Sequence, residues 1–203
     1  MLALALALTG SAGARAFEQA RSETGARLSW PTREIAIAFD ATITADERAA
    51  ILRAAATWSA AVVPCGGVRF HAATATESSA GARAVVVTRG ALPDNARTLA
   101  AKTDVHARDP RRGDIDGAVI TLDEGRVFST SERPPAGAFD VETIALHELG
   151  HALGLAHPVG IVRDLTSVMN AGAKPGAVKR ALGGDDIKGA CAISATGASA
   201  TSP

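Results

Sequence analysis

The sequence has no excess of charge of either sign: 21 lysine and arginine residues are balanced by 21 aspartate and glutamate residues. It also has no long block of like charge and no internal repeat. Nucleic acids and anionic membranes attract proteins through clustered positive charge, so we expect neither as a partner. With 203 residues, the chain suits one compact domain better than two, and we expect a monomer.

Cysteine is also scarce. Cys65 and Cys191 are the only two, and they form no C-x-x-C pair of the kind that binds metal. In an oxidising compartment we expect them to form a disulfide. It would close a very long loop, worth about 4–5 kcal/mol in the chain-entropy model. The alternative is two buried free thiols.

Long hydrophobic runs are missing as well. The apolar run at residues 1–8 is too short to span a bilayer as a helix. Ala14 and Ala16 provide small residues at the two positions that a signal peptidase reads, although the usual positive segment before the apolar run is absent. We interpret residues 1–16 as a signal peptide, so that the protein is secreted or periplasmic. The alternative is a buried N-terminal helix.

One window of eleven residues contains three of the five histidines and reads H-E-x-x-H-x-x-G-x-x-H. On a helix, His147 and His151 project from the same face because they are four residues apart. Gly154 can adopt the left-handed conformation that ends a helix, which would bring His157 back as a third ligand. Three imidazoles leave the fourth tetrahedral position of Zn²⁺ open to water, as in a catalytic site. Glu148 lies beside them as the candidate general base.

The alternative interpretation is a surface helix whose histidines have no common task. That interpretation would explain one histidine pair. It does not explain a glutamate, a helix-ending glycine and a third histidine at the required offsets. The window therefore predicts one catalytic zinc, and no other histidine or cysteine cluster has the spacing for a second.

At these residues the chain resembles the metzincin zinc peptidases, whose signature is the same elongated motif followed by a methionine turn. Ser167-Val168-Met169-Asn170 is available for that turn. The resemblance implies that Met169 forms an apolar floor under the metal without binding it. Without the resemblance, Met169 would be an ordinary core methionine.

Hydrophobic patterns predict an α+β fold. Thr44 and Glu47 form a capping box that begins a helix ending near Val62, with a buried stripe at Ile51, Ala55, Trp58 and Val62. A second long helix begins near Asp140 and carries His147 and His151, and a short final helix covers residues 185–191. Strands are expected at residues 35–39, 68–70, 84–88, 99–105 and 115–122, the last two as a hairpin.

Within the metzincins, the order of elements is similar to that of the matrixins. Local stretches agree, at Trp30, 56–59, 140–143 and 185–189, so the resemblance covers residues 28–193. It implies a zincin-like fold: a twisted, mixed five-stranded sheet with two long helices and a short C-terminal helix. We therefore assign the catalytic domain to residues 17–195 and a disordered tail to residues 196–203.

The chain departs from related families in several ways. Pro158 follows the third histidine, where matrixins usually have serine, and the tyrosine of serralysins and astacins is missing. No histidine-rich loop for a structural zinc is found, and His71 and His106 are expected to be ordinary surface or loop residues. Calcium is possible but unsupported. Its candidate ligands are Asp104, Asp109, Asp114 and Asp116, which we interpret as turn residues balanced by Arg108, Arg111 and Arg112.

The predicted activity is hydrolysis of peptide bonds by a zinc-activated water, with Glu148 as the general base. The resemblance implies that an extended polypeptide substrate pairs with an edge strand around Thr98 to Val105. It also implies that the histidine-bearing helix and the segment after Met169 line the pocket for the substrate side chain on the C-terminal side of the cleaved bond. Two alternatives remain: a zinc amidase acting on cell-wall peptides, and a catalytically silent binding module that contains zinc.

Overall fold

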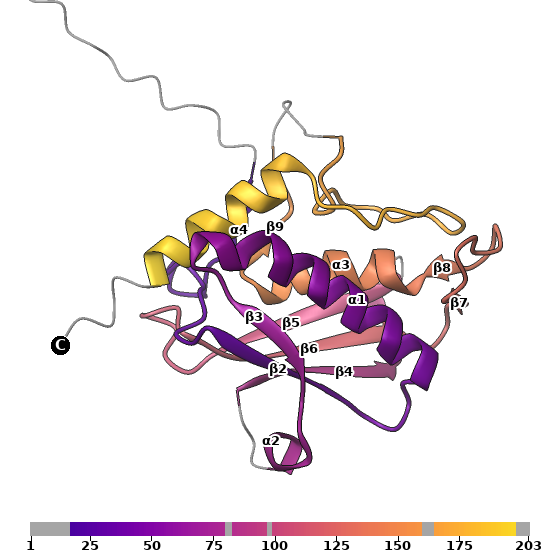
Figure 1. Cartoon of the computed structure of the whole chain (residues 1–203), viewed down its shortest axis with the longest axis horizontal. Helices are drawn as coiled ribbons and strands as arrows, with labels where there is room; N and C mark the ends of the chain where they lie inside the picture. The colour runs from indigo at the N-terminus through magenta and orange to yellow at the C-terminus, as the bar shows by residue number, and fades with distance from the viewer. Residues whose placement is uncertain (1–16, 80–82, 97–98, 160–164, 198–203) are drawn as a thin grey trace, which may run out of the picture.

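The structure is a computed structural model of the whole chain, and it describes residues 17–79, 83–96, 99–159 and 165–197 (Figure 1). The predicted signal peptide at residues 1–16 lies outside the described residues. The elements in chain order are β1 (Glu18–Gln19), β2 (Glu34–Phe39), α1 (Ala45–Val62), η1 (Val63–Cys65), β3 (Arg69–Ala72), α2 (Ala75–Ser79), β4 (Ala84–Gly90), η2 (Asp94–Ala96), β5 (Ala101–Ala107), β6 (Ile115–Asp123), β7 (Phe128–Ser129), β8 (Phe139–Asp140), α3 (Val141–Ala152), β9 (Leu155–Ala156) and α4 (Gly184–Gly197).

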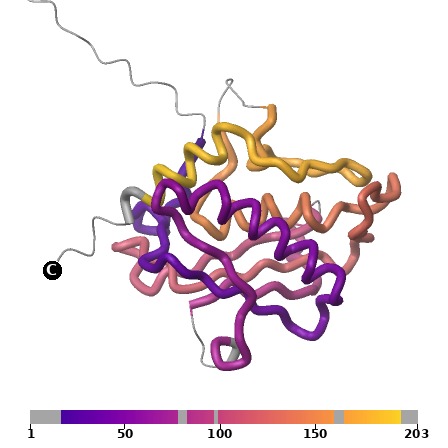
Figure 2. Tube along the Cα trace, in the orientation of Figure 1, coloured from indigo at the N-terminus to yellow at the C-terminus, as the bar shows by residue number. Residues whose placement is uncertain are grey.

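A mixed five-stranded sheet forms one layer, with the strand order β3-β2-β4-β6-β5. Parallel pairs join β3 to β2, β2 to β4 and β4 to β6, and β5 runs antiparallel to β6. The α+β fold, the five strands and the antiparallel hairpin are therefore confirmed. Helices α1 and α3 lie side by side on one face of this sheet (Figures 1 and 2). No helix among the described residues is long and apolar enough to cross a membrane.

Helix α1 begins at the predicted capping box. The Thr44 hydroxyl accepts a hydrogen bond from the backbone N–H of Glu47, and the Glu47 carboxylate accepts one from the backbone N–H of Thr44. The predicted stripe is buried, because Ile51, Ala55, Trp58 and Val62 are at most 2% exposed. This stripe packs α1 against α3 and the sheet, which gives α3 a rigid support.

The final helix is longer than predicted. Residues 185–191 were expected, whereas α4 spans Gly184–Gly197 and so includes the first two residues of the predicted tail. Residues 198–203 lie outside the described residues. The short elements β1, β7, β8 and β9 were not predicted, because a two-residue strand has no hydrophobic period that a sequence can reveal.

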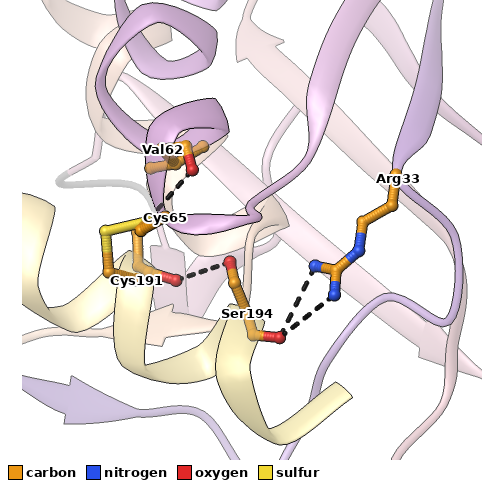
Figure 3. Close-up of a disulfide and its surroundings, with 6 residues drawn as sticks. Arg33, Val62, Cys65, Cys191 and Ser194 are labelled. Atoms are coloured by element: carbon orange, nitrogen blue, oxygen red, sulfur yellow. Dashed lines mark hydrogen bonds between the residues drawn. A yellow bond between two sulfur atoms is a disulfide. The ribbon is translucent and has the colours of Figure 1, made fainter. Parts of the chain in front are cut away.

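A disulfide between Cys65 and Cys191 ties the end of α1 to α4, as predicted (Figure 3). The two residues are 126 positions apart in sequence, and their Cα atoms lie 5.7 Å apart. One turn further along α4, the Arg33 guanidinium donates to the backbone carbonyl of Ser194 at 3.5 Å. The final helix is therefore fastened to the rest of the domain by a covalent bond and a polar contact.

Replacing both Cys65 and Cys191 by serine should lower the free energy of unfolding by about 3–5 kcal/mol, because the disulfide closes a very long loop in the unfolded chain. Urea unfolding at neutral pH measures the change. The unfolding of the double variant should be insensitive to a reductant that destabilises the wild-type protein. Equal stability of the two proteins without reductant would contradict the expectation.

Candidate metal centre

Both tryptophans of the chain hold the backbone of α3. The Trp58 indole N–H donates to the carbonyl of Leu146 at 2.8 Å, and the Trp30 indole N–H donates to the carbonyl of Ala152 at 2.7 Å. Both indole rings are buried. At the other end of the helix, Asp140 is the N-cap, as predicted, and accepts from the backbone N–H of Thr143 at 2.9 Å. These contacts fix the helix that carries the two motif histidines.

The structure brings the three predicted histidines together. The Nε2 atom of His147 lies 3.0 Å from that of His157 and 3.1 Å from that of His151, and His151 and His157 are 3.1 Å apart at the same atoms. Gly154 produces the predicted reversal with a φ of 99°. A side chain there would collide with the carbonyl oxygen of Leu28, 2.7 Å from an added Cβ, so the tight turn requires glycine.

Backbone carbonyls orient two of the rings. The Nδ1 atom of His147 lies 2.7 Å from the carbonyl oxygen of Val168, and that of His151 lies 2.9 Å from the carbonyl oxygen of Leu155. These contacts place the ring proton on Nδ1 and leave a lone pair on Nε2. Burial lowers the pKa of His147 to about 4 and also lowers the pKa values of His151 and His157. At neutral pH, the three histidines are therefore uncharged, and their Nε2 lone pairs converge on one point.

This donor set fits a divalent metal ion. In a tetrahedral site with Zn–N distances of 2.0–2.1 Å, the nitrogens are about 3.3 Å apart, close to the spacing observed here. Imidazole nitrogens with carbonyl-bound Nδ1 atoms are typical ligands of zinc. His147, His151 and His157 are the residues that would hold the ion.

A buried carboxylate holds the predicted methionine turn in place. Asp186 of α4 accepts from the Ser167 hydroxyl at 2.5 Å, and from the backbone N–H groups of Val168 and Gly183 at 2.8 and 2.7 Å. The same turn supplies the carbonyl of Val168 that orients His147. The orientation of His147, a candidate metal ligand, therefore depends on the final helix.

Met169 packs against the histidine-bearing helix at Gly150. The Met169 side chain is buried, and a Cβ added at Gly150 would lie 2.3 Å from its Sδ atom and 3.1 Å from Cζ2 of Trp58. Gly150 stands between His147 and His151 in sequence, and the absence of its side chain lets the Met169 sulfur pack closely against this part of the helix. This close packing agrees with the floor that the metzincin resemblance implies for Met169.

We expect Gly150→Ala to destabilise the protein by about 1–3 kcal/mol, because overpacking outweighs the usual helix preference for alanine. Thermal unfolding of the metal-free protein measures the effect. Gly184→Ala is the matched control, since an added Cβ there meets nothing within 4 Å in the first turn of α4. If Gly150→Ala were as stable as this control, the close packing under the histidines would not matter.

Glu148 points into the same site and is 5% exposed. The Thr103 hydroxyl donates to its Oε2 atom at 2.6 Å. Burial raises the pKa of Glu148, while the proximity of His151 and the Thr103 hydrogen bond act in the opposite direction. A carboxylate with a raised pKa is suited to accept a proton near neutral pH, as a general base must.

The histidines and Glu148 line a cleft of about 520 Å³. One wall is β5, the edge strand of the sheet, together with Leu99 and Ala100 before it. Residues 171–173, which follow Met169, line the cleft as well. The edge strand and the segment after Met169 therefore border the site as expected, although Thr98 lies outside the described residues.

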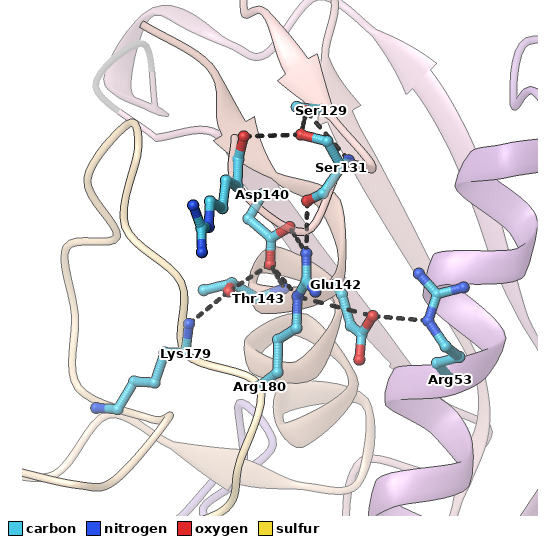
Figure 4. Close-up of polar contacts among 9 residues, drawn as sticks. Arg53, Ser129, Ser131, Asp140, Glu142, Thr143, Lys179 and Arg180 are labelled. Carbon is cyan, nitrogen blue, oxygen red and sulfur yellow. Dashed lines mark hydrogen bonds and ion pairs between the residues drawn. The ribbon is translucent and has the colours of Figure 1, made fainter. Parts of the chain in front are cut away.

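The segment that follows residues 171–173 is anchored to the start of α3 (Figure 4). Arg180 donates from Nε to Oδ2 of Asp140 at 2.9 Å and from Nη2 to Oδ1 at 2.6 Å, and the Asp140 side chain is fully buried. The backbone N–H of Lys179 donates to the Thr143 hydroxyl at 2.8 Å. On the other side of α3, Arg53 of α1 pairs with Glu142 at 2.8 Å.

Arg180→Met should lower the free energy of unfolding at pH 7 by about 2–3 kcal/mol, because the buried Asp140 carboxylate loses its charged partner. Burial raises the pKa of Asp140, but hydrogen bonds from Arg180 and Thr143 outweigh burial and lower it overall. A lowered folded-state pKa stabilises the fold above the unfolded value near 3.9, and this contribution disappears as pH falls through the folded value. The difference in the free energy of unfolding between wild type and Arg180→Met should therefore shrink below about pH 4.

Urea unfolding as a function of pH tests this expectation. The control is Arg53→Met, whose partly exposed side chain pairs with Glu142 and should contribute less than about 1 kcal/mol. If Arg180→Met lost the same free energy of unfolding from pH 7 to pH 3, the charge of Asp140 would not be the cause of the destabilisation.

Of the candidate calcium ligands, Asp109 and Asp114 lie in the predicted turn, whereas Asp104 lies on β5 and Asp116 on β6, so these two are strand residues and not turn residues. Asp114 contacts Arg112 at 2.8 Å, Asp116 contacts Arg108 at 3.7 Å, and Asp104 pairs with Lys102. In the described ranges, the three motif histidines are the one group of at least three metal-ligating side chains that converges on a point.

The two remaining histidines lie on strands. His106 is exposed on β5. His71 is half-buried on β3, and its ring nitrogens lie 3.1 Å from the Glu77 carboxylate and 3.7 Å from the Glu34 carboxylate. His71 is therefore a paired strand residue and not a loop residue.

The fold and the site define an α+β domain with three converging histidines that could hold a metal ion and an adjacent glutamate. A family model described as Matrixin matches residues 29–194, and the chain belongs to the matrixin family. A curated relative, metalloendoproteinase 1 of Glycine max, is 41% identical over 59 residues, which are 29% of this chain and 18% of the relative. The matched part thus spans less than a fifth of that relative.

Sequence reasoning missed two residues of the site. Thr103 interrupts a row of apolar residues on alternate positions of β5, Ala101, Val105 and Ala107, and that interruption is a signal that could have identified it. Gly150 lies inside the motif, but at a position where the pattern accepts any residue. Its role follows from a contact with Met169, nineteen positions later, which no local pattern reveals.

Proposed function

We propose that this protein is a zinc-dependent endopeptidase that cleaves extended polypeptides. The observation that carries the proposal is the convergence of three uncharged Nε2 atoms beside the buried Glu148, in a cleft bordered by an edge strand. Membership of the matrixin family and the name of the soybean relative support the same activity.

Zn²⁺ bound by the three histidines would polarise the carbonyl of the bond to be cleaved and lower the pKa of a bound water molecule. Glu148 accepts a proton from the attacking water and later delivers it to the departing amine nitrogen. Its burial excludes competing water from the carboxylate and strengthens its polar contacts. His147 and His151 are kept in the correct orientation by the carbonyls of Val168 and Leu155.

The substrate would bind as an additional strand. β5 is an edge strand of the sheet, so one row of its backbone N–H and C=O groups faces away from β6. An extended peptide could pair with this edge and cross the cleft above the histidines. Residues 171–173 would then contact the side chain that follows the cleaved bond.

We also infer that the protein works outside the cytoplasm, in the periplasm or the extracellular space. The disulfide between Cys65 and Cys191 supports this inference, because such bonds persist in oxidising compartments. Residues 1–16 would be removed as a signal peptide during export. Non-reducing mass spectrometry of secreted protein would detect both the new N-terminus and the linked cysteine peptides.

Glu148→Gln should reduce peptide cleavage by about 10²–10⁴-fold, because the amide cannot accept the proton. Its zinc content should stay at one ion per chain, since all three histidines remain.

His151→Ala should lose both activity and zinc under dialysis. Elemental analysis and cleavage of unstructured casein, with cell-wall peptides as the comparison substrate, measure these effects. Wild-type activity in zinc-loaded Glu148→Gln would rule out the proposed role of Glu148, and cleavage of cell-wall peptides alone would favour an amidase.

A further inference from the structure

One polar side chain on the α3-facing side of β5 reaches the proposed base. Ala101, Val105 and Ala107 alternate with outward-facing residues and pack towards the core, and Thr103 occupies the same row. Its Oγ1 atom lies 2.6 Å from Oε2 of Glu148 and 3.2 Å from the Glu148 carbonyl oxygen. The hydroxyl has a single proton to donate, and the shorter distance assigns it to the Glu148 carboxylate and not to the carbonyl oxygen.

We propose that Thr103 is a positioning residue for Glu148, an inference that rests on the proposed peptidase function. The side chain of glutamate has three rotatable bonds, so the carboxylate of Glu148 needs a partner to keep one orientation. In the described part of the chain, the Thr103 hydroxyl is the one hydrogen-bond donor to this carboxylate. With Oε2 engaged, Oε1 is left to accept the proton of the attacking water.

Thr103 is well suited to this task for two reasons. Its β-branched side chain has a restricted χ1 angle, so the hydroxyl is held in place by the strand itself. In addition, β5 is the edge along which the substrate would lie. The same strand therefore sets the positions of the peptide and of the base, and misplacement by about 1 Å can cost about 10²-fold in rate.

Thr103→Val keeps the shape of the side chain and removes the hydroxyl, whereas Thr103→Ser keeps the hydroxyl. We expect Thr103→Val to lower kcat for casein-derived peptides at least tenfold, with KM within twofold of wild type and full zinc content. Thr103→Ser should recover most of kcat. Thr121→Val on β6 is the matched control with unchanged kcat, because Thr121 does not line the cleft. Wild-type kcat in Thr103→Val, or equal loss in the valine and serine variants, would overturn the inference.

A second measurement does not depend on turnover. The carboxylate stretching band of Glu148 can be assigned in the infrared spectrum of metal-free protein as the band lost in Glu148→Gln. Thr103→Val should shift this band, and Thr103→Ser should leave it near its wild-type position. An unshifted band in Thr103→Val overturns the inference whatever the activity. A shifted band in a protein that cleaves no peptide overturns the proposed function instead.

Discussion

The structure depends on holding three uncharged imidazole nitrogens within 3.1 Å of one another, with their lone pairs directed at a common point. These lone pairs repel each other unless a cation lies between them, so the surrounding protein must supply the energy that keeps them together. It does so with backbone carbonyls and with buried side chains. Carbonyls fix the rings of His147 and His151, and two buried indoles fix the helix from which both histidines project.

A single buried carboxylate connects this centre to the far end of the chain. Asp186 binds the methionine turn, the turn orients His147, and α4, which carries Asp186, is joined to the end of α1 by the disulfide. Two contacts therefore join the final helix to His147: one from Asp186 to the backbone of Val168, and one from the Val168 carbonyl to the His147 ring. The last helix therefore belongs to the architecture of the site, although none of the side chains described for residues 184–194 lines the cleft.

Much of the fold could be predicted because its signals are local. The capping box at Thr44 and the histidine motif each lie within a few residues, and the α1 stripe repeats at helical spacing over three turns. The contacts that complete the site are not local. Arg180 meets Asp140 across 40 positions and Thr103 meets Glu148 across 45, and neither pair follows a period that the sequence could reveal. The length of α4 was underestimated because Ser194, Thr196 and Gly197 near its end favour a helix only weakly.

This division between local and distant contacts separates two properties of the proposed enzyme. All three candidate metal ligands lie within eleven residues, on α3 and after the turn at Gly154. In the proposed enzyme, the orientation of Glu148 and the binding of the substrate would both depend on β5, an edge strand that precedes the motif. Edge strands lack a partner on one side and are the part of a sheet most easily displaced. Changes in β5 can therefore alter the rate of peptide cleavage while leaving the metal centre intact.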